Sequence, residues 1–311
     1  MLDLDGKVVL VTGALTAVGR QLGARLVSLG ASVALVDAQA DGSGETLSSE
    51  INAGVGRAAS IYVQTDLRQT HDIRLMVDAA VLTFGRLDVL VNNAQSIVDQ
   101  AAGDEDVQRV GDSIDVNLRA PVVATWVFSR YLRQAGSAGV VVNVAAMAGL
   151  VPGSGREVYG AANAGLIHFT EAHRRNLAPE LRVCGLAPYY VDSPADGGGG
   201  ERLLPGNRLG AALTLSSDQV VAAVVRCIQD TRLNGRTLLI AGSSTYTHTW
   251  AFLLARLHMF AIMVWSMLVL VLQRLVGRGR ADAKAGEGVS KPDDAASNLD
   301  EAFAEDAKKT C

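Results

Sequence analysis

The sequence predicts a doubly wound parallel α/β sheet, followed by a hydrophobic helix and a polar tail. Short apolar runs alternate with amphipathic stretches through most of the chain, which is the pattern of parallel strands joined by helices. A glycine-containing turn follows the first apolar run. The 311-residue chain is 49% hydrophobic and 19% charged, a composition that excludes a disordered protein.

The first strand–helix–strand unit illustrates the pattern. Residues 8–12 form a β-branched apolar run, which predicts a buried strand. After the turn, leucines repeat at helical spacing until Gly30, which predicts the end of a helix. Residues 32–36 are again apolar and stop at Asp37, so we expect a second buried strand there.

The same alternation continues along the chain. Further strands are expected at residues 60–64, 87–92, 139–144, 182–186 and 237–241. Helices are expected at residues 72–84, 107–117, 121–134, 159–177 and 218–230. Strands joined through helices pair in parallel, so these segments predict one parallel sheet with helices on both faces.

Charge and cysteine content argue against a nucleic-acid-binding or zinc-binding function. Lys and Arg total 28 against 32 Asp and Glu, a formal net charge of −4, so we expect no nucleic acid partner. The three cysteines, Cys184, Cys227 and Cys311, lack zinc-site spacing, and we expect no metal. The first residues are acidic where a signal peptide needs a basic and then an apolar stretch, which places the folded domain in the cytosol.

An apolar segment near the C-terminus departs from the α/β pattern. Residues 249–276 are apolar on all sides of an expected helix and are interrupted by Arg256 and Arg274. This distribution favours a helix that spans or lies in a membrane, in contact with lipid. The alternative is a helix packed inside an oligomer or against the preceding domain.

The last residues form a polar tail. Residues 277–311 have the composition of a flexible segment. Near the C-terminus of this segment, the pair Lys308 and Lys309 resembles the dilysine signal of the endoplasmic reticulum. The expected organisation is therefore a dinucleotide-binding domain over residues 1–245, a membrane-associated helix over residues 249–276, and the tail. The domain is expected to face the cytosol.

The turn after the first strand has the features of a dinucleotide-binding loop. Glycines at this place let the backbone approach a pyrophosphate at a helix N-terminus. Asp37 can bind the 2′-hydroxyl of an adenine ribose and would repel a 2′-phosphate, so we expect NAD rather than NADP. A tight turn without a ligand is the alternative. The loop residues expected to bind the cofactor are Thr12, Gly13, Thr16, Val18 and Gly19.

These motifs, in this order, resemble the short-chain dehydrogenase/reductase family over about residues 5–243. The glycine loop is similar to the family's TGxxxGxG motif, with Ala17 at the middle glycine. A later Asn-Asn-Ala-Gln segment is similar to its NNAG motif, with Gln95 in place of glycine. The resemblance implies a Rossmann fold, an adenine contact from Asp66, and Pro188 beside the nicotinamide. It also implies cofactor contacts from Leu67, Asn93, Ala94 and Tyr159.

The resemblance further implies a catalytic set with two members replaced. In the family, a tyrosine exchanges a proton with the substrate oxygen, a lysine four residues later lowers its pKa, and an upstream serine donates a hydrogen bond. Here Tyr159 and the structural Asn117 are kept, whereas Asn163 and Ala146 stand at the lysine and serine positions. Loss of a positioned proton-transfer group slows a reaction about 10²–10⁴-fold, and loss of an oxyanion donor about 10²–10³-fold.

Three functions are consistent with these residues. The first is a pseudoenzyme, or a weak non-standard oxidoreductase, that keeps an NAD pocket at a membrane. The second is an active NAD(P)-dependent oxidoreductase on a hydrophobic alcohol or ketone, with Arg156 and Ser154 as a substitute cation and hydroxyl. The third is a non-catalytic subunit paired with an active relative. A homo- or hetero-oligomer is expected in each case.

Overall fold

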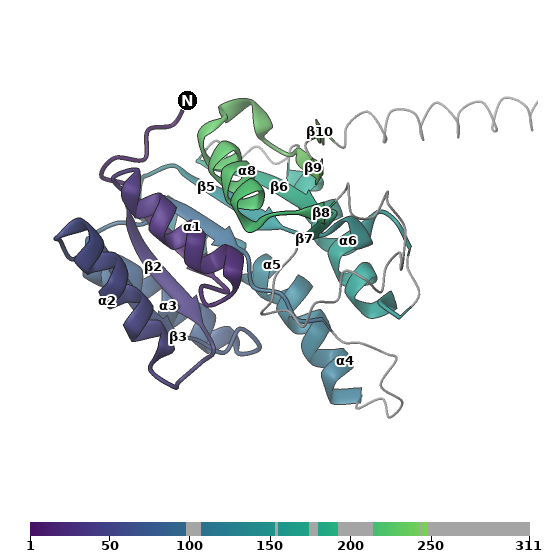
Figure 1. The fold of residues 1–311 in the computed structure, drawn as a ribbon, viewed down its shortest axis with the longest axis horizontal. Helices are drawn as coiled ribbons and strands as arrows, with labels where there is room; N and C mark the ends of the chain where they lie inside the picture. The colour runs from purple at the N-terminus through teal and green to yellow at the C-terminus, as the bar shows by residue number, and fades with distance from the viewer. Residues whose placement is uncertain (98–106, 153–154, 174–179, 192–213, 243, 248–311) are drawn as a thin grey trace, which may run out of the picture. The chain divides into compact units, whose positions relative to one another are not determined.

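The computed structural model describes residues 1–97, 107–152, 155–173, 180–191, 214–242 and 244–247. These residues lie within Met1–Trp250, which forms one compact unit (Figure 1). The predicted segments 249–276 and 277–311 lie outside them. Across the described part of the chain, no helix is both long and apolar enough to cross a membrane.

The main sheet has the strand order β10-β9-β6-β5-β4-β1-β2-β3. All neighbouring strands in it pair in parallel except β10, which runs antiparallel to β9 at one edge. A separate parallel pair joins β7 to β8. The strands are β1 (Val8–Thr12), β2 (Ser32–Asp37), β3 (Ser60–Gln64), β4 (Val89–Asn92), β5 (Gly139–Val144), β6 (Leu181–Pro188), β7 (Tyr190–Val191), β8 (Thr214–Leu215), β9 (Thr237–Ala241) and β10 (Ser244–Thr247).

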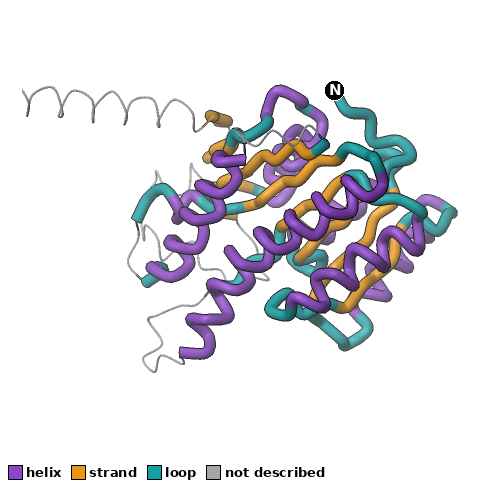
Figure 2. Tube along the Cα trace, turned by 180° about the vertical axis from the view of Figure 1, so that it is seen from behind, coloured by secondary structure: helices purple, strands orange, loops and turns teal. Residues whose placement is uncertain are grey.

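Helices cover both faces of the sheet (Figures 1 and 2). They are α1 (Ala17–Ser28), α2 (Ser43–Val55), α3 (Thr70–Phe84), α4 (Val107–Ile114), α5 (Ala120–Ala135), α6 (Glu157–Ala172) and α8 (Ser217–Gln229). Helix α1 contacts α2 and α8 on one face, and α5 contacts α3 and α6 on the other. The predicted doubly wound α/β fold is therefore confirmed.

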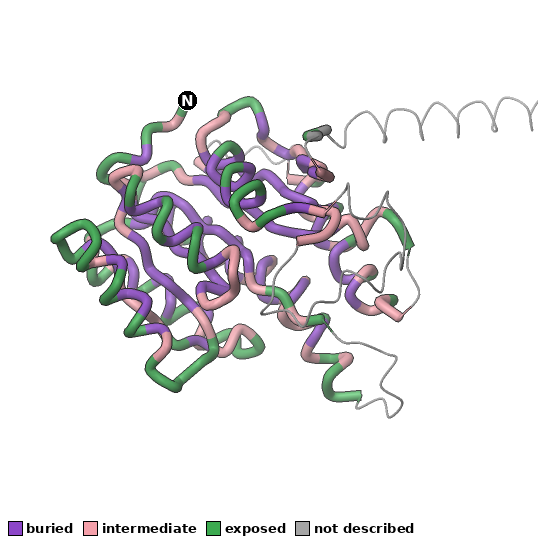
Figure 3. The backbone as a smooth tube through the Cα atoms, viewed as in Figure 1, coloured by how far each residue is buried: buried purple, intermediate pink, exposed green. Residues whose placement is uncertain are grey.

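The pleat of β1 explains why both faces need cover. All five of its residues are buried, and the strands form the buried centre of the unit (Figure 3). Val9 and Val11 pack in the cluster formed with α1, α2 and α8, while Val8 and Leu10 pack in the cluster formed with α3 and α5. Alternate side chains of a strand point to opposite faces, so a continuous apolar run fits a sheet covered on both sides.

Several elements differ from the prediction. Helix α2 was not predicted, and its glycines explain this, because glycine weakens a helix. One of them is required here, since a Cβ at Gly44 would overlap the ring of Tyr62. The expected helix at residues 107–117 is divided into α4 and a π-helical turn, Asp115–Arg119. The described part of the helix expected at residues 159–177 ends at Ala172.

The direction of winding reverses at the carboxyl ends of β1 and β4. These two strands are neighbours, yet the chain leaves β1 toward β2 and leaves β4 toward β5. In doubly wound sheets, ligands bind outside the carboxyl ends of the strands at this reversal. Thr12 ends β1, Asp37 ends β2, and Asn93 follows β4, so the fold brings these residues to one edge of the sheet.

Candidate active site

The loop between β1 and α1 is closed by a capping threonine and two glycines. The Thr16 hydroxyl accepts a hydrogen bond from the Gly19 N–H (3.1 Å) and donates one to the Gly13 carbonyl (2.8 Å). Gly13 has a φ of +67°, and a Cβ there would lie 2.7 Å from the Ala94 Cα. A Cβ at Gly19 would overlap the Gly13 carbonyl oxygen. Larger residues at either glycine would therefore displace the loop.

The first turn of α1 can receive an anion. Among the described residues, the N–H groups of Ala17 and Val18 have no hydrogen-bond acceptor, as expected at the start of a helix. The first turn contains no acidic side chain, and the helix dipole adds partial positive charge there. These features fit a pyrophosphate at this end of α1. Ala17, at the family's middle glycine, begins the helix with regular geometry.

The Asp37 carboxylate lies against the same loop. One oxygen accepts a hydrogen bond from the Leu15 N–H (2.9 Å), and the other accepts one from the Ala38 N–H (2.8 Å). The residue is half-buried, so its remaining lone pairs are accessible to a ligand. A carboxylate at this place fits the hydroxyls of an adenine ribose.

Tyr62 on β3 supports the end of β2, and the sequence did not predict this role. Its single hydroxyl proton is shared between two acceptors, the carbonyl oxygens of Gln39 (2.5 Å) and Asp37 (3.1 Å). Burial and the nearby Asp37 carboxylate raise the pKa of Tyr62 to about 12. The neutral hydroxyl therefore holds the segment that carries Asp37.

Residues at the end of β4 are hydrogen-bonded to the glycine loop in the interior of the fold. The Thr12 hydroxyl accepts hydrogen bonds from the N–H groups of Asn93 (3.0 Å) and Ala94 (3.1 Å). The Asn93 side-chain amide donates to the carbonyl oxygens of Thr12 and Gly13, both at 3.1 Å. Thr12 and Asn93, both buried, therefore hold the loop through backbone groups.

Asp66 and Leu67 follow β3. The Arg68 guanidinium binds both oxygens of the Asp66 carboxylate at 2.9 and 3.0 Å, and it also binds Asp112 at 2.7 Å. The hydrogen bonds from Arg68 keep the pKa of Asp66 below its usual range. Leu67 is half-buried and packs against the core. The predicted adenine contact of Asp66 would therefore share this carboxylate with Arg68.

Asn117 lies in the π-helical turn and is 3% exposed. Its side-chain oxygen accepts a hydrogen bond from the Ser96 N–H (3.1 Å), and its nitrogen donates to the Ser96 carbonyl (2.6 Å) and the Ser113 carbonyl (2.8 Å). One side chain thus binds both backbone groups of Ser96. The backbone next to Gln95 is fixed as a result.

Tyr159 contacts a residue that the sequence identified only as a departure from the family motif. It lies on α6, is 4% exposed, and donates its hydroxyl proton to Oε1 of Gln95 at 2.6 Å. The Gln95 amide nitrogen donates to the carbonyl oxygens of Val144 (3.2 Å) and Ala145 (3.3 Å). Gln95 therefore bridges the predicted catalytic tyrosine and the end of β5.

The two replaced positions of the catalytic motif, Ala146 and Asn163, carry neither a hydroxyl nor a charged group. Ala146 follows β5 and is buried. Asn163 is 1% exposed, and its amide nitrogen donates to the Tyr159 carbonyl one turn earlier at 2.8 Å. Arg156 is the N-cap residue of α6, and Ser154 lies outside the described residues.

Pro188 ends β6 at a buried position, paired in register with Ile240 of β9. Tyr189, where the family usually has glycine, donates its N–H to the Ile240 carbonyl at 2.9 Å. The backbone after β6 is thus held to β9, and the half-buried Tyr189 ring belongs to the segment predicted to lie beside the nicotinamide.

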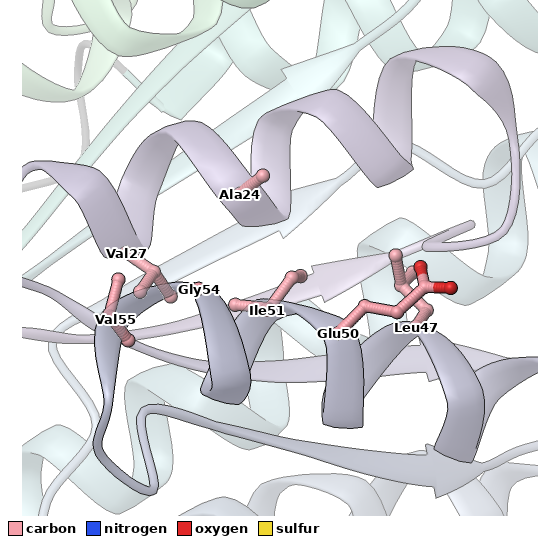
Figure 4. A pocket seen from close by; sticks show the side chains of 7 residues that line it. All are labelled: Ala24, Val27, Leu47, Glu50, Ile51, Gly54 and Val55. Carbon is pink, nitrogen blue, oxygen red and sulfur yellow. The ribbon is translucent and has the colours of Figure 1, made fainter.

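A separate cavity of about 360 Å³ lies between α1 and α2 (Figure 4). Its lining includes none of the predicted site residues, so we assign it no part in the site at the strand ends. Within the described ranges, no group of His, Cys, Asp or Glu side chains could hold a metal ion. The cavity is lined by Ala24, Val27, Leu47, Glu50, Ile51, Gly54 and Val55.

Known proteins share this architecture. The family model for short chain dehydrogenases matches residues 7–201. Trans-4-hydroxycyclohexanecarboxylate dehydrogenase of Sinomonas cyclohexanicum is 31% identical over 62% of this chain and 75% of its own length. The 15-hydroxyprostaglandin dehydrogenase (NAD+) of Mus musculus is 27% identical over 78% of this chain and 92% of its own. The crystal structure of a short chain dehydrogenase from Burkholderia cenocepacia J2315 in complex with NADP has a TM-score of 0.68 and 29% identity, covering 78% and 98% of the two chains.

The matched region includes the glycine loop, the end of β4, the π-helical turn and α6. The structural relatives agree with the observed arrangement of strands and helices over most of the described residues. On these grounds the chain belongs to the short-chain dehydrogenase/reductase family.

Proposed function

We propose that this chain binds NAD(H) at the family's cofactor site and does not carry out the family's usual hydride transfer. The hydrogen bond between Tyr159 and Gln95 carries this proposal. A bound nicotinamide supplies or accepts the hydride in this family. A proton must also pass between the tyrosine and the substrate oxygen, and neither Ala146 nor Asn163 offers the group that assists this transfer.

The size of the defect can be measured by restoring both groups. Each replacement slows the reaction by about 10²-fold or more, and the two effects need not add because both concern one proton transfer. We therefore expect Ala146→Ser combined with Asn163→Lys to exceed the wild-type rate of ketone reduction, followed by NADH absorbance. A wild-type protein that reduces the ketone at a measurable rate, and as fast as the double variant, would overturn the pseudoenzyme proposal.

The charge of Asp37 supports NAD over NADP, while the N–H groups at the start of α1 support a pyrophosphate, which both cofactors contain. A related structure contains NADP, so the choice of cofactor needs a direct measurement. Fluorescence titration of the full chain should give micromolar binding of NADH, with NADPH about tenfold weaker or more. Absence of NADH binding at millimolar concentration, by folded protein, would refute the cofactor site. A non-catalytic subunit of a homo- or hetero-oligomer would then be the better assignment, which light scattering of the native complex would test.

An active oxidoreductase on a hydrophobic alcohol or ketone is the second candidate. Two observations favour it: Tyr159 is kept, and the relatives named above are dehydrogenases of hydroxyl-bearing compounds. In that case the wild-type chain turns over with NAD and such an alcohol, and Tyr159→Phe abolishes the reaction. If the Phe variant retained the wild-type rate, Tyr159 would not be the proton donor.

We further propose that residues 249–276 associate with a membrane, with residues 1–245 on its cytosolic side and residues 277–311 as a tail. The apolar composition of the segment supports this, and the Lys308–Lys309 pair favours the endoplasmic reticulum. The full chain should float with phosphatidylcholine vesicles, and Trp265→Asp should weaken flotation because a charge in the hydrocarbon is unfavourable. A wild-type chain that stays in the aqueous fraction would contradict the proposal.

A further inference from the structure

Both polar atoms of the Gln95 side chain make hydrogen bonds inside the candidate active site. Its carbonyl oxygen accepts the Tyr159 hydroxyl at 2.6 Å. Its amide nitrogen carries two protons and donates to the carbonyls of Val144 at 3.2 Å and Ala145 at 3.3 Å. Three contacts from two other elements therefore fix the orientation of this carboxamide, with the oxygen toward the tyrosine.

Both neighbours of Gln95 in the chain are also held. The Ala94 N–H is bound to the Thr12 hydroxyl, and the Ser96 N–H and carbonyl are both bound to Asn117. The backbone of Gln95 therefore has little freedom to withdraw. Movement of the carboxamide away from the site would have to come from its side-chain torsions.

The tyrosine is held equally firmly from its own side. The turn that follows Ala146 approaches α6 so closely that a Cβ at Gly149 would lie 2.6 Å from the Ala164 N. A Cβ at Gly160, next to Tyr159, would lie 2.9 Å from the Ala148 carbonyl oxygen. The Tyr159–Gln95 contact therefore joins two closely packed parts of the fold.

A carboxamide oxygen and a ketone oxygen are equivalent as hydrogen-bond acceptors for a phenol. The Tyr159 hydroxyl has one proton to donate, and the substrate oxygen in this family needs that proton. We propose that the Gln95 carboxamide is an internal ligand that occupies the place of the substrate oxygen on Tyr159, an inference that rests on the proposed function. Gln95 thus excludes carbonyl and alcohol ligands from Tyr159, independently of the replacements at Ala146 and Asn163.

Two defects can therefore be distinguished: the missing serine and lysine, and the occupation of Tyr159 by Gln95. Restoring the serine and the lysine leaves the carboxamide on the tyrosine. In the Ala146→Ser, Asn163→Lys background, we expect Gln95→Gly to raise NADH-dependent reduction of cyclohexanone by about 10²-fold or more, since proton transfer then reaches the substrate. Gln95→Ala should act in the same direction without adding backbone freedom. The matched control is Gln21→Ala, which removes an exposed amide from α1.

A second readout needs neither turnover nor cofactor. In protein labelled with ¹³C at tyrosine Cζ, the Tyr159 signal is assigned with Tyr159→Phe among the six tyrosines of the chain. Gln95→Gly should shift this signal, and cyclohexanone should then perturb it in the variant and leave it unchanged in the wild type. Identical Tyr159 signals in wild type and variant, or equal ketone perturbation in both, would overturn the inference.

The two proposals fail in different ways. If no variant binds NADH, the proposed function fails, while the tyrosine signal still decides whether Gln95 occupies Tyr159. If NADH binds and the double variant is already as fast as the triple variant, the proposed function stands and the role of Gln95 is refuted.

Discussion

Thr12→Val isolates the hydrogen bonds that join the glycine loop to the end of β4. The Thr12 side chain is buried at 2% exposure, and valine has nearly its shape, so the change leaves no cavity. It removes the oxygen that accepts the N–H groups of Asn93 and Ala94 at 3.0 and 3.1 Å. Both donors belong to the backbone and have no side-chain freedom with which to find another acceptor.

The expected loss follows from these two donors. A buried donor left without an acceptor destabilises a fold by about 1–3 kcal/mol, so two should lower the free energy of unfolding by roughly 3 kcal/mol after the gain from one buried methyl. For a domain of this size, that corresponds to a fall in Tm of roughly 6–12 °C. Binding of NADH should weaken as well, because Gly13 lies directly after Thr12.

Thr125→Val is the matched control. Thr125 is 1% exposed, but its hydroxyl only donates to the Pro121 carbonyl at 2.7 Å, and that oxygen also receives the Asn92 amide at 3.4 Å. Its loss should lower the free energy of unfolding by about 1 kcal/mol or less. Thermal unfolding followed by circular dichroism compares the two variants. Equal losses of Tm would refute the argument that Thr12 is required as an acceptor.

Asp37→Ser should reduce the preference for NADH over NADPH by about tenfold, because the variant lacks the charge that repels a 2′-phosphate; an unchanged ratio of Kd values would contradict this role. The pKa of Tyr62 is raised to about 12, so the folded protein favours the neutral phenol. The resulting contribution to the free energy of unfolding is fully present below the ordinary pKa of 10.0 and is lost as pH rises toward 12. Tyr62→Phe should remove that late step from an alkaline absorbance titration. Burial lowers the pKa of His173, so its contribution to the free energy of unfolding is present above the ordinary pKa of 6.5 and is lost as pH falls. In His173→Phe, the free energy of unfolding from urea titrations should change less between about pH 7.5 and 5.5.

The sheet could be predicted because burial on both faces leaves a strong local signal. Val8–Val11 of β1 are all apolar, and the strand ends at Thr12, directly before the glycine turn. Helix α2 gave no comparable signal, because Gly44 lowers its helix propensity while serving the packing of Tyr62. The edge strand β10 likewise depends on its pairing with β9, which local sequence does not encode.

The candidate site could be predicted as a set of residue types and only partly as a set of contacts. Thr12, Asp37 and Tyr159 occupy recognisable positions in ordered motifs. Tyr159 and Gln95 are 64 positions apart, and their hydrogen bond depends on how β4 and α6 are placed in three dimensions. In the same way, Cys184 and Cys227 have no informative spacing, yet the Cys184 thiol donates to the Cys227 carbonyl at 3.3 Å in the core.

The departures from the family pattern are unevenly distributed over the site. The half expected to face a dinucleotide keeps Gly13, Gly19, the capping threonine and the acid at the end of β2, and it differs at Ala17. The half around Tyr159 differs at Gln95, Ala146 and Asn163. Although the Gln95 residue is exposed, its carboxamide oxygen contacts the Tyr159 hydroxyl and its nitrogen contacts the Val144 and Ala145 carbonyls. The replacements at Ala146 and Asn163 remove a hydroxyl and a charge, whereas Gln95 adds an acceptor for the Tyr159 hydroxyl. We therefore propose two separate effects: the replacements slow proton transfer, and Gln95 competes with a substrate oxygen for the Tyr159 hydroxyl.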